Sequence, residues 1–337
     1  MRCANVLIST ALCLTVVGRA DVGFAGSDRL FVSNEYGANI SVIDSKTGPI
    51  KDIQISGRPG DVRPRGMAIS PDGKTVYVAV SDFLPDAENI EDAIVAIDVQ
   101  SGEITRKYRA GGNPERIAIS PDGTQIWAAL EAVALAVGID TETGQELGRF
   151  ATGVEPEGID ISPDGNFVYV TGETSHTVSV IDAKSLSLVT HMLVGNRPRD
   201  VAFAPDGKFA YASAEIGGTV SVIDVSQHRV INTISLGLDS RPVELVVSGD
   251  GASIYVAGGG TSAIYVIDAS TQKVAHVIKE RMGRRPWGVG VSKDGGRVYS
   301  ANGLSDSVSV IDTGCMCVTD QIKAGRGAHS IEVSHVE

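Results

Sequence analysis

Residues 158–193 read GIDISPDGNFVYVTGETSHTVSVIDAKSLSLVTHML, a stretch in which four short apolar runs alternate with turn-forming residues. The runs span 158–162, 167–171, 177–182 and 188–193, and each has the length of one β-strand. Pro163, Asp164 and Gly165 separate the first two runs. They favour a hairpin, because proline restricts φ and glycine tolerates positive φ. The stretch therefore predicts four antiparallel strands.

The same unit recurs along the whole chain. An apolar run that ends in aspartate, most often Val-Ile-Asp, occurs seven times, and three of the six intervals are 42 residues long. These aspartates are Asp44, Asp98, Asp140, Asp182, Asp224, Asp268 and Asp312. Four-stranded units of this length are typical of β-propeller blades. The sequence therefore predicts an all-β fold, a propeller of seven four-stranded antiparallel blades.

The two ends of the repeat region predict how the ring closes. Residues 329–334 match the first strand of a unit, and residues 29–34 match the second strand. We expect the C-terminal strand to pair with the N-terminal blade, because this closes the ring and removes an exposed sheet edge. Residues 26–337 are therefore expected to form a single domain.

The first 25 residues have the pattern of an export signal. Arg2 precedes an apolar run from Val6 to Val17, and Ala20 and Ala25 each complete a small-x-small cleavage site. The run is 12 residues long, whereas a membrane-spanning helix needs about 20. We expect a soluble periplasmic protein, cleaved after Ala20 or Ala25, that is monomeric and not inserted in the membrane.

Charge and cysteine content limit the classes of function. The net charge of -12 argues against general nucleic-acid binding, which depends on Lys and Arg. Beyond the signal only Cys315 and Cys317 remain, so a framework of disulfides is not expected. We interpret this pair as two half-buried structural thiols on one side of an outer strand, with a soft-metal or redox role as the alternative.

The loops that precede the first strand of each blade are rich in arginine. They contain 10 of the 19 arginines of the chain and none of its 10 lysines. In a propeller these loops surround the central channel on one face, and a guanidinium group binds carboxylate or phosphate bidentately. We therefore predict that this channel mouth binds an anion. The predicted ligand-binding residues are Arg65, Arg199, Arg241, Arg285, Trp287, His329, Glu157 and Glu244.

A structural interpretation of the same residues stays open. The arginines can pair with acids of neighbouring blades, such as Glu157 or Glu244, without any ligand. A second set of acids lies nine residues before the repeat aspartate in four blades, and we interpret its members as structural: Glu35, Glu131, Glu173 and Glu215. The acidic insertion at 81–92 is either a solvated loop or a partner or cation site.

Catalytic, metal and cofactor motifs are not found. The six histidines are scattered singly, and no Cys-x-x-Cys-His haem attachment sequence occurs. The chain also has no nucleotide-binding glycine pattern, Walker sequence or Gly-x-Ser-x-Gly elbow. The sequence therefore predicts no catalytic residue, no metal site and no firmly bound cofactor.

Several segments resemble the YVTN-family β-propeller repeat. Each is followed by a Val-Ile-Asp type segment, at one offset from the aromatic residue in three of them and eight residues later after 77–79, where the repeat carries an insertion: 31–34 (FVSN), 77–79 (YVA), 168–171 (VYVT) and 299–302 (YSAN). The chain departs from the family pattern at 126–129 (IWAA) and at 258–260 (GGG). The opening stretch 28–35 (DRLFVSNE) is also similar to the exported propellers associated with alcohol catabolism that depends on pyrroloquinoline quinone.

This narrower resemblance implies a non-catalytic binding or scaffold protein, accessory to alcohol oxidation by quinoprotein enzymes. Pyrroloquinoline quinone, a tricarboxylate, then fits the predicted anion site as a ligand. A quinoprotein dehydrogenase or a transporter component is the implied partner. The dehydrogenase itself is disfavoured, because such enzymes resemble eight-bladed propellers rich in tryptophan and this chain has two Trp.

Two alternatives stay open. One is a lactonase-like hydrolase or lyase that uses His329 with Glu157 or Glu244 as acid and base on an anionic substrate. The other is a propeller that binds single-stranded DNA, with Trp287 stacking on a base.

Overall fold

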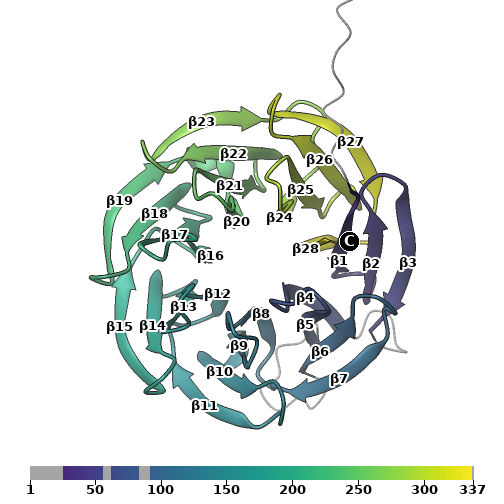
Figure 1. The fold of residues 1–337 in the computed structure, drawn as a ribbon. Helices are drawn as coiled ribbons and strands as arrows, with labels where there is room; N and C mark the ends of the chain where they lie inside the picture. The colour runs from purple at the N-terminus through teal and green to yellow at the C-terminus, as the bar shows by residue number, and fades with distance from the viewer. Residues whose placement is uncertain (1–25, 56–61, 83–91, 336–337) are drawn as a thin grey trace, which may run out of the picture.

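The computed structural model describes residues 26–55, 62–82 and 92–335. Seven four-stranded antiparallel sheets form a closed ring (Figure 1), which confirms the predicted seven-bladed propeller. Blades 1 to 7 contain the strands β28-β1-β2-β3, β4–β7, β8–β11, β12–β15, β16–β19, β20–β23 and β24–β27.

The strands have four positions in a blade. The innermost strands are β28 (Ala328–His335), β4 (Val62–Ile69), β8 (Pro114–Ile119), β12 (Pro156–Ile161), β16 (Pro198–Phe203), β20 (Pro242–Val247) and β24 (Pro286–Val291). The second strands are β1 (Asp28–Asn34), β5 (Thr75–Asp82), β9 (Gln125–Leu130), β13 (Phe167–Gly172), β17 (Phe209–Ala214), β21 (Ser253–Gly258) and β25 (Arg297–Asn302).

The third strands are β2 (Asn39–Asp44), β6 (Ala93–Asp98), β10 (Leu135–Asp140), β14 (Thr177–Asp182), β18 (Thr219–Asp224), β22 (Ala263–Asp268) and β26 (Ser307–Asp312). The outer strands are β3 (Gly48–Gln54), β7 (Ile104–Arg109), β11 (Glu146–Ala151), β15 (Ser187–Leu193), β19 (Arg229–Ser235), β23 (Lys273–Ile278) and β27 (Cys317–Lys323). Two short 3-10 turns complete the described elements, η1 (Glu131–Val133) and η2 (Leu238–Ser240).

The hairpins form as the Ser-Pro-Asp-Gly pattern predicts. In blade 4, Ser162 Oγ donates to Asp164 Oδ1 at 2.6 Å, and Phe167 N donates to Ser162 Oγ at 2.9 Å. Gly165 has φ of 70°, a conformation that costs glycine little. Local side-chain hydrogen bonds therefore hold the turn between the first two strands of a blade.

The ring closes through strands from opposite ends of the chain. β28 pairs with β1 in antiparallel register, with Ile331 opposite Val32 and Val333 opposite Leu30. This confirms the predicted closure and gives blade 1 four strands, the same number as in every other blade.

Apolar side chains fill the space between neighbouring blades. Trp127 of blade 3 packs at 5.3 Å from Phe150, measured between ring centroids, in a cluster that also holds Ile159 and Val168 of blade 4. Trp127 lies opposite Gly138 on β10, where an added Cβ would lie 3.1 Å from the indole. The departure from the repeat at 126–129 is thus a local repacking of the core.

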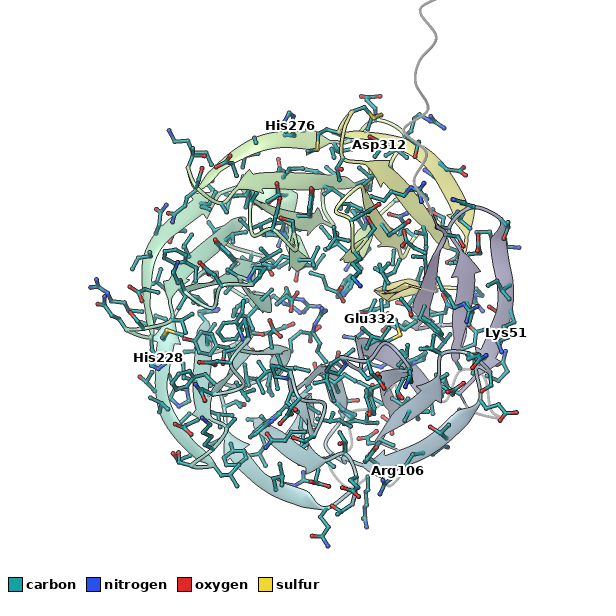
Figure 2. All side chains as sticks on the ribbon, viewed as in Figure 1. Lys51, Arg106, His228, His276, Asp312 and Glu332 are labelled. Carbon is teal, nitrogen blue, oxygen red and sulfur yellow. A yellow bond between two sulfur atoms is a disulfide. The ribbon has the colours of Figure 1, made fainter. Side chains whose placement is uncertain are left out.

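Three of the histidines lie at the outer strands, away from the centre of the ring. His191 and His276 lie on outer strands and His228 directly precedes one. Figure 2 shows His228 and His276 at the circumference and Glu332 near the centre. Among the described residues, no helix is long and apolar enough to cross a membrane.

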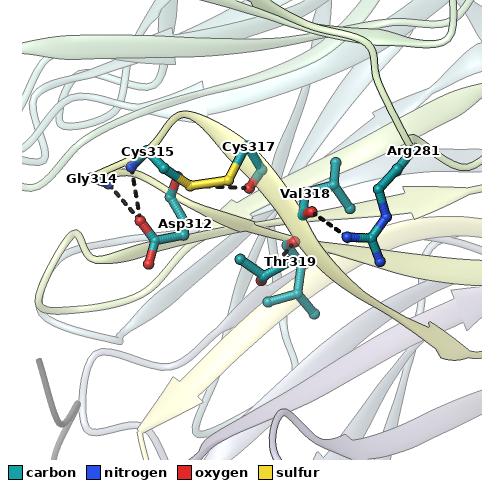
Figure 3. The surroundings of a disulfide bond; sticks show 8 residues. Arg281, Asp312, Gly314, Cys315, Cys317, Val318 and Thr319 are labelled. Carbon is teal, nitrogen blue, oxygen red and sulfur yellow. Dashed lines mark hydrogen bonds between the residues drawn. A yellow bond between two sulfur atoms is a disulfide. The ribbon is translucent and has the colours of Figure 1, made fainter. Parts of the chain in front are cut away.

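The interpretation of the two cysteines as half-buried thiols is wrong. Cys315 and Cys317 form a disulfide (Figure 3), and both residues are exposed. Cys315 lies in the turn between β26 and β27, Cys317 is the first residue of β27, and Met316 between them has a left-handed φ of 50°. This turn, not strand alternation, brings the two sulfurs together.

Candidate functional site

A repeated backbone hydrogen bond joins two sets of loops on one face of the ring. In blade 4, Glu155 precedes the inner strand with φ of 56°, and its carbonyl accepts the N–H of Glu173 at 2.9 Å. In blade 5 the carbonyl of Arg197 accepts the N–H of Glu215 at 2.8 Å. The other acceptor–donor pairs are Asn113–Glu131, Arg241–Gly259, Arg285–Gly303 and Gly327–Glu35. The arginine-rich loops and the second set of acids therefore lie side by side.

A β-bulge near the start of each inner strand points consecutive side chains toward the centre. In β12, Pro156 pairs with Gly172 while Ile159 pairs with Val170, so three steps on β12 oppose two on β13. The other six inner strands show a similar shift. Bulges re-aim side chains in this way, so Arg199 and its neighbour Asp200 both form ion pairs with other blades.

Arg65 and Arg199 form a first set of ion pairs, which share Glu157. Arg65 Nη1 lies 2.9 Å from Glu35 Oε1, and its Nη2 lies 3.3 Å from Glu157 Oε1 and contacts Glu115. Arg199 Nη2 lies 3.2 Å from the same Glu157 oxygen. Burial alone would lower the pKa of Arg65, but Glu115, Glu157 and Glu35 outweigh it and raise that pKa. Arg65 is therefore held as a cation within a carboxylate cage.

Arg116 forms a second set of ion pairs, with carboxylates of blades 5 and 6. Its Nη1 lies 2.6 Å from Glu244 Oε1, and its Nε lies 3.3 Å from Asp200 Oδ1. Burial raises the pKa of Glu244 to about 7, although Arg116 opposes this shift. Glu332 lies deeper, and burial together with Glu244 raises its pKa to about 8. These central carboxyls therefore keep their protons to a higher pH than ordinary glutamates.

The ion pairs answer the question that the sequence left open for the arginines. Arg65, Arg199 and Glu157 are bound to one another, as the structural interpretation predicts. In contrast, no carboxylate among the described residues pairs with four exposed arginines of the same face, namely Arg241, Arg284, Arg285 and Arg326. Arg58 and most of the acidic insertion lie outside the described residues.

A change in the repeat explains why Arg285 lacks a carboxylate partner. Arg197 Nε lies 2.8 Å from Glu173 Oε2 of the preceding blade and 3.4 Å from Glu215 Oε2 of its own blade. In blades 6 and 7 the equivalent positions are Gly259 and Gly303. Arg285 in blade 7 therefore has glycine at both places where Arg197 has a carboxylate.

A pocket of about 320 Å³ lies beside Gly303, where one of the two carboxylates is missing, and Glu35 of blade 1 also lines it. Arg285 Cζ lies 4.9 Å from the ring centroid of Trp287, and the rings of Trp287 and His329 are 4.9 Å apart. The lining residues are Glu35, Tyr36, Arg65, Arg285, Trp287, Gly303, Leu304, Gly327, Ala328 and His329. We call this space the blade 7–blade 1 pocket.

His329 is a polar group without a partner in the wall of this pocket. Its side chain is buried, and neither ring nitrogen forms a hydrogen bond with a described residue. Burial and the nearby cations Arg65 and Arg199 hold its pKa well below 6.5. The imidazole is therefore neutral near pH 7 and can accept one hydrogen bond and donate another.

A smaller cavity of about 10 Å³ lies inward of the pocket and shares Trp287 and His329 with it. Glu157, Glu244 and Arg199 also line this cavity. Its size is close to the least that holds one water molecule. The two spaces together provide room for an organic anion outside and a water inside.

Comparisons with known proteins agree with the fold. The family model "Lactonase, 7-bladed beta-propeller" matches residues 187–316. A comparison with curated proteins found no match. The solved structures described next are 17–19% identical to this chain, so they show likeness of fold alone.

Three solved structures illustrate this likeness. A functionally unknown protein from Desulfotomaculum acetoxidans has a TM-score of 0.78 at 18% identity, covering 92% of this chain and all of that one (100%). Hydrazine synthase of Kuenenia stuttgartiensis has a TM-score of 0.71 at 19% identity, covering 84% and 96%. The dihydro-heme d1 dehydrogenase NirN, in a complex with DHE, has a TM-score of 0.63 at 17% identity, covering 90% and 74%.

The structure distributes the predicted site residues over three places. Arg65, Arg285, Trp287 and His329 line the blade 7–blade 1 pocket. Arg199, Glu157 and Glu244 line the small inner cavity, which also includes Trp287 and His329. Arg241 lines neither space and is exposed.

Among the residues of the site that were not predicted as members are Glu35, Glu115, Arg116 and Asp200. Strand alternation would turn Arg116 away from the centre if Glu115 faces it, and only the bulge brings both inside. The change from glutamate to glycine at 259 and 303 was a usable signal in the sequence. Among the described residues, no group of three or more His, Cys, Asp or Glu could hold a metal ion.

Proposed function

We propose that this protein binds a small organic anion in the blade 7–blade 1 pocket. The observation that carries the proposal is the exposed Arg285, which has Gly259 and Gly303 where the repeat elsewhere supplies carboxylates. A ligand carboxylate would occupy the place of the missing glutamate group and form a charge-assisted hydrogen bond with the guanidinium.

The walls of the pocket favour a planar, unsaturated ligand. Trp287 is partly exposed there, and Tyr36 and Leu304 are 50% and 58% exposed. A planar polycarboxylate can stack on the indole and present carboxylates to Arg285. Pyrroloquinoline quinone belongs to this class. A role as a periplasmic, non-catalytic accessory of quinone-dependent alcohol oxidation is part of the proposal, and the sequence resemblance supports it.

Thermal unfolding of the protein tests the proposal with pyrroloquinoline quinone, citrate, inorganic phosphate and an oligonucleotide as probes. A ligand at 100 times its Kd stabilises the folded state by about 2.7 kcal/mol. We expect stabilisation by the planar polycarboxylate, its loss in Arg285→Ala, and its retention in Arg109→Ala, an exposed arginine on outer strand β7. No stabilisation by any carboxylate would contradict the proposal.

Arg285→Ala is the informative variant because Arg285 makes no ion pair with a described residue. Substitution of Arg65 or Arg199 would instead break the buried network and confuse ligand binding with folding. Stabilisation by the oligonucleotide alone, with steep loss as salt rises, would indicate a DNA-binding propeller.

A second candidate is a hydrolase that opens a lactone. The lactonase family model supports it, and so does the convergence of His329, Glu157 and Glu244 on the inner cavity. A neutral His329 could take a proton from a water held there, while Glu244, with a pKa of about 7, has both protonation states available. Hydrolysis of an anionic lactone that disappears in His329→Gln, but not in Arg109→Ala, would favour this candidate.

A further inference from the structure

The disulfide between Cys315 and Cys317 lies on the face of the ring opposite the pocket. The repeat aspartate Asp312 begins its turn, and Asp312 Oδ1 accepts the N–H groups of Gly314 at 2.8 Å and Cys315 at 3.0 Å (Figure 3). Both cysteines are exposed, while Met316 packs against the apolar cluster that includes Val318. The turn therefore presents both sulfurs to solvent on an anchored backbone.

The same turn forms in other blades without a disulfide. In blade 4, Asp182 Oδ1 accepts the N–H groups of Lys184 at 3.0 Å and Ser185 at 2.7 Å. Leu186 has φ of 53°, against 50° for Met316. The fold of this turn comes from the aspartate and the strand pairing, so the disulfide is not needed to build it.

Blade 4 also shows what the turn does to the two positions that the cysteines occupy. Ser185 and Ser187 are the equivalent residues, and their hydroxyl oxygens lie 2.8 Å apart. The turn thus brings these side chains into contact before any covalent bond exists. Two thiols at 315 and 317 would remain neighbours after reduction and could re-form the bond.

The disulfide also closes a very short loop, with one residue between its cysteines. Its contribution to stability through loop closure is correspondingly small, because that contribution grows with loop length. The pairing of Asp312 with Cys317 and of Ile311 with Val318 already holds the two strands. An exposed disulfide of little structural value is the kind that exchanges with thiols.

We propose that Cys315 and Cys317 form a thiol–disulfide exchange site that accepts two electrons from a dithiol. The incoming thiolate attacks one sulfur, a mixed disulfide forms, and the other cysteine leaves as a thiolate. The second thiol of the donor, as its thiolate, then attacks the mixed disulfide. The donor is oxidised to its disulfide, and Cys315 and Cys317 are both released as thiols, which take up the two protons of the donor. The natural donor is a dithiol peptide or protein.

Reduction of the folded protein by dithiothreitol tests this proposal. Differential alkylation and mass spectrometry of the peptide that contains Cys315 and Cys317 separate it from Cys3 and Cys13. We expect reduction at a rate at least equal to that of glutathione disulfide, with a Tm within about 3 °C of the oxidised protein. Reduction only after unfolding, or a larger fall in Tm, would overturn the proposal because the bond would then be structural.

Single-cysteine variants test the exchange step itself. Cys317→Ser and Cys315→Ser are each incubated with a peptide that contains a disulfide-bonded Cys-x-x-Cys, and the mixed disulfide is trapped by acid. We expect a trapped adduct on the peptide around residues 315–317 with at least one of them, and none on that peptide with Cys315→Ser/Cys317→Ser, which reproduces the serine pair of blade 4. No adduct with either single variant would overturn the proposal.

Discussion

Arg116 Nη1 lies 2.6 Å from Glu244 Oε1, and this ion pair joins blade 3 to blade 6 across the centre of the ring. Both side chains are largely buried, and Asp200 of blade 5 contacts the same guanidinium. The centre of the ring is therefore held by charges as well as by the apolar clusters between blades. Breaking such a pair leaves a buried carboxylate without compensation.

We predict that Arg116→Met lowers the free energy of unfolding by about 3–5 kcal/mol, because Glu244 and Asp200 lose their cation. Urea denaturation measures this change. The matched control is Arg149→Met, since Arg149 pairs with Glu146 at the exposed outer strand β11. The control should cost less than about 1 kcal/mol. Equal effects of the two variants would show that the central pair is no stronger than a surface pair.

Gly158 allows two inner strands to approach. A Cβ added there would lie 2.5 Å from Asp200 Cα and 2.7 Å from the carbonyl oxygen of Arg199, both backbone atoms of the next blade. We predict that Gly158→Ala lowers the free energy of unfolding by about 1–3 kcal/mol or more through overpacking. Gly249→Ala is the control, because an added Cβ there meets no atom within 4 Å. A neutral Gly158→Ala would refute the close approach.

Glu332 gives a pH dependence with a definite sign. Its pKa is about 8 in the folded protein against 4.5 as the ordinary value, so between these limits the folded state binds more protons than the unfolded state. The contribution of Glu332 to stability therefore falls as pH rises from 4.5 to 8. We predict that Glu332→Gln raises the Tm more at pH 9 than at pH 5. Glu103→Gln, at an exposed site, should follow the wild type at both pH values.

Trp287 reports on the pocket directly. The chain has two Trp, and Trp127 is fully buried in the core while Trp287 lies beside Arg285 and His329. We predict that an anionic ligand changes the fluorescence of the wild type but not that of Trp287→Leu. Arg285→Ala should weaken binding about 10- to 100-fold, the loss of one charge-assisted hydrogen bond. A signal that persists in Trp287→Leu would place the ligand elsewhere.

The repeat made most of the architecture predictable. Strands at 167–171 and 177–182 were expected and occur at Phe167–Gly172 and Thr177–Asp182, because alternation and turn residues act over a few positions. Residues 29–34 and 329–334 likewise identified the strands that close the ring. The arginine-rich face followed from the position of the loops in each unit.

The partners of the charged residues were not predictable in the same way. Arg65 meets Glu157 across a separation of 92 residues, and the bulge that admits both Glu115 and Arg116 to the centre interrupts the alternation on which strand prediction depends. The turn that joins Cys315 to Cys317 has a left-handed residue between them, which an alternating strand does not contain.

Local pattern therefore established the number of blades and their strands, because both depend on contacts between residues close in the chain. It also predicted the closure of the ring, because the two ends of the chain carry strands that complete one repeat unit. The tertiary structure decided which arginines are neutralised and which, like Arg285, remain available. That outcome depends on charges brought together from different blades. Charged side chains from different blades come within ion-pair distance only when the ring has closed.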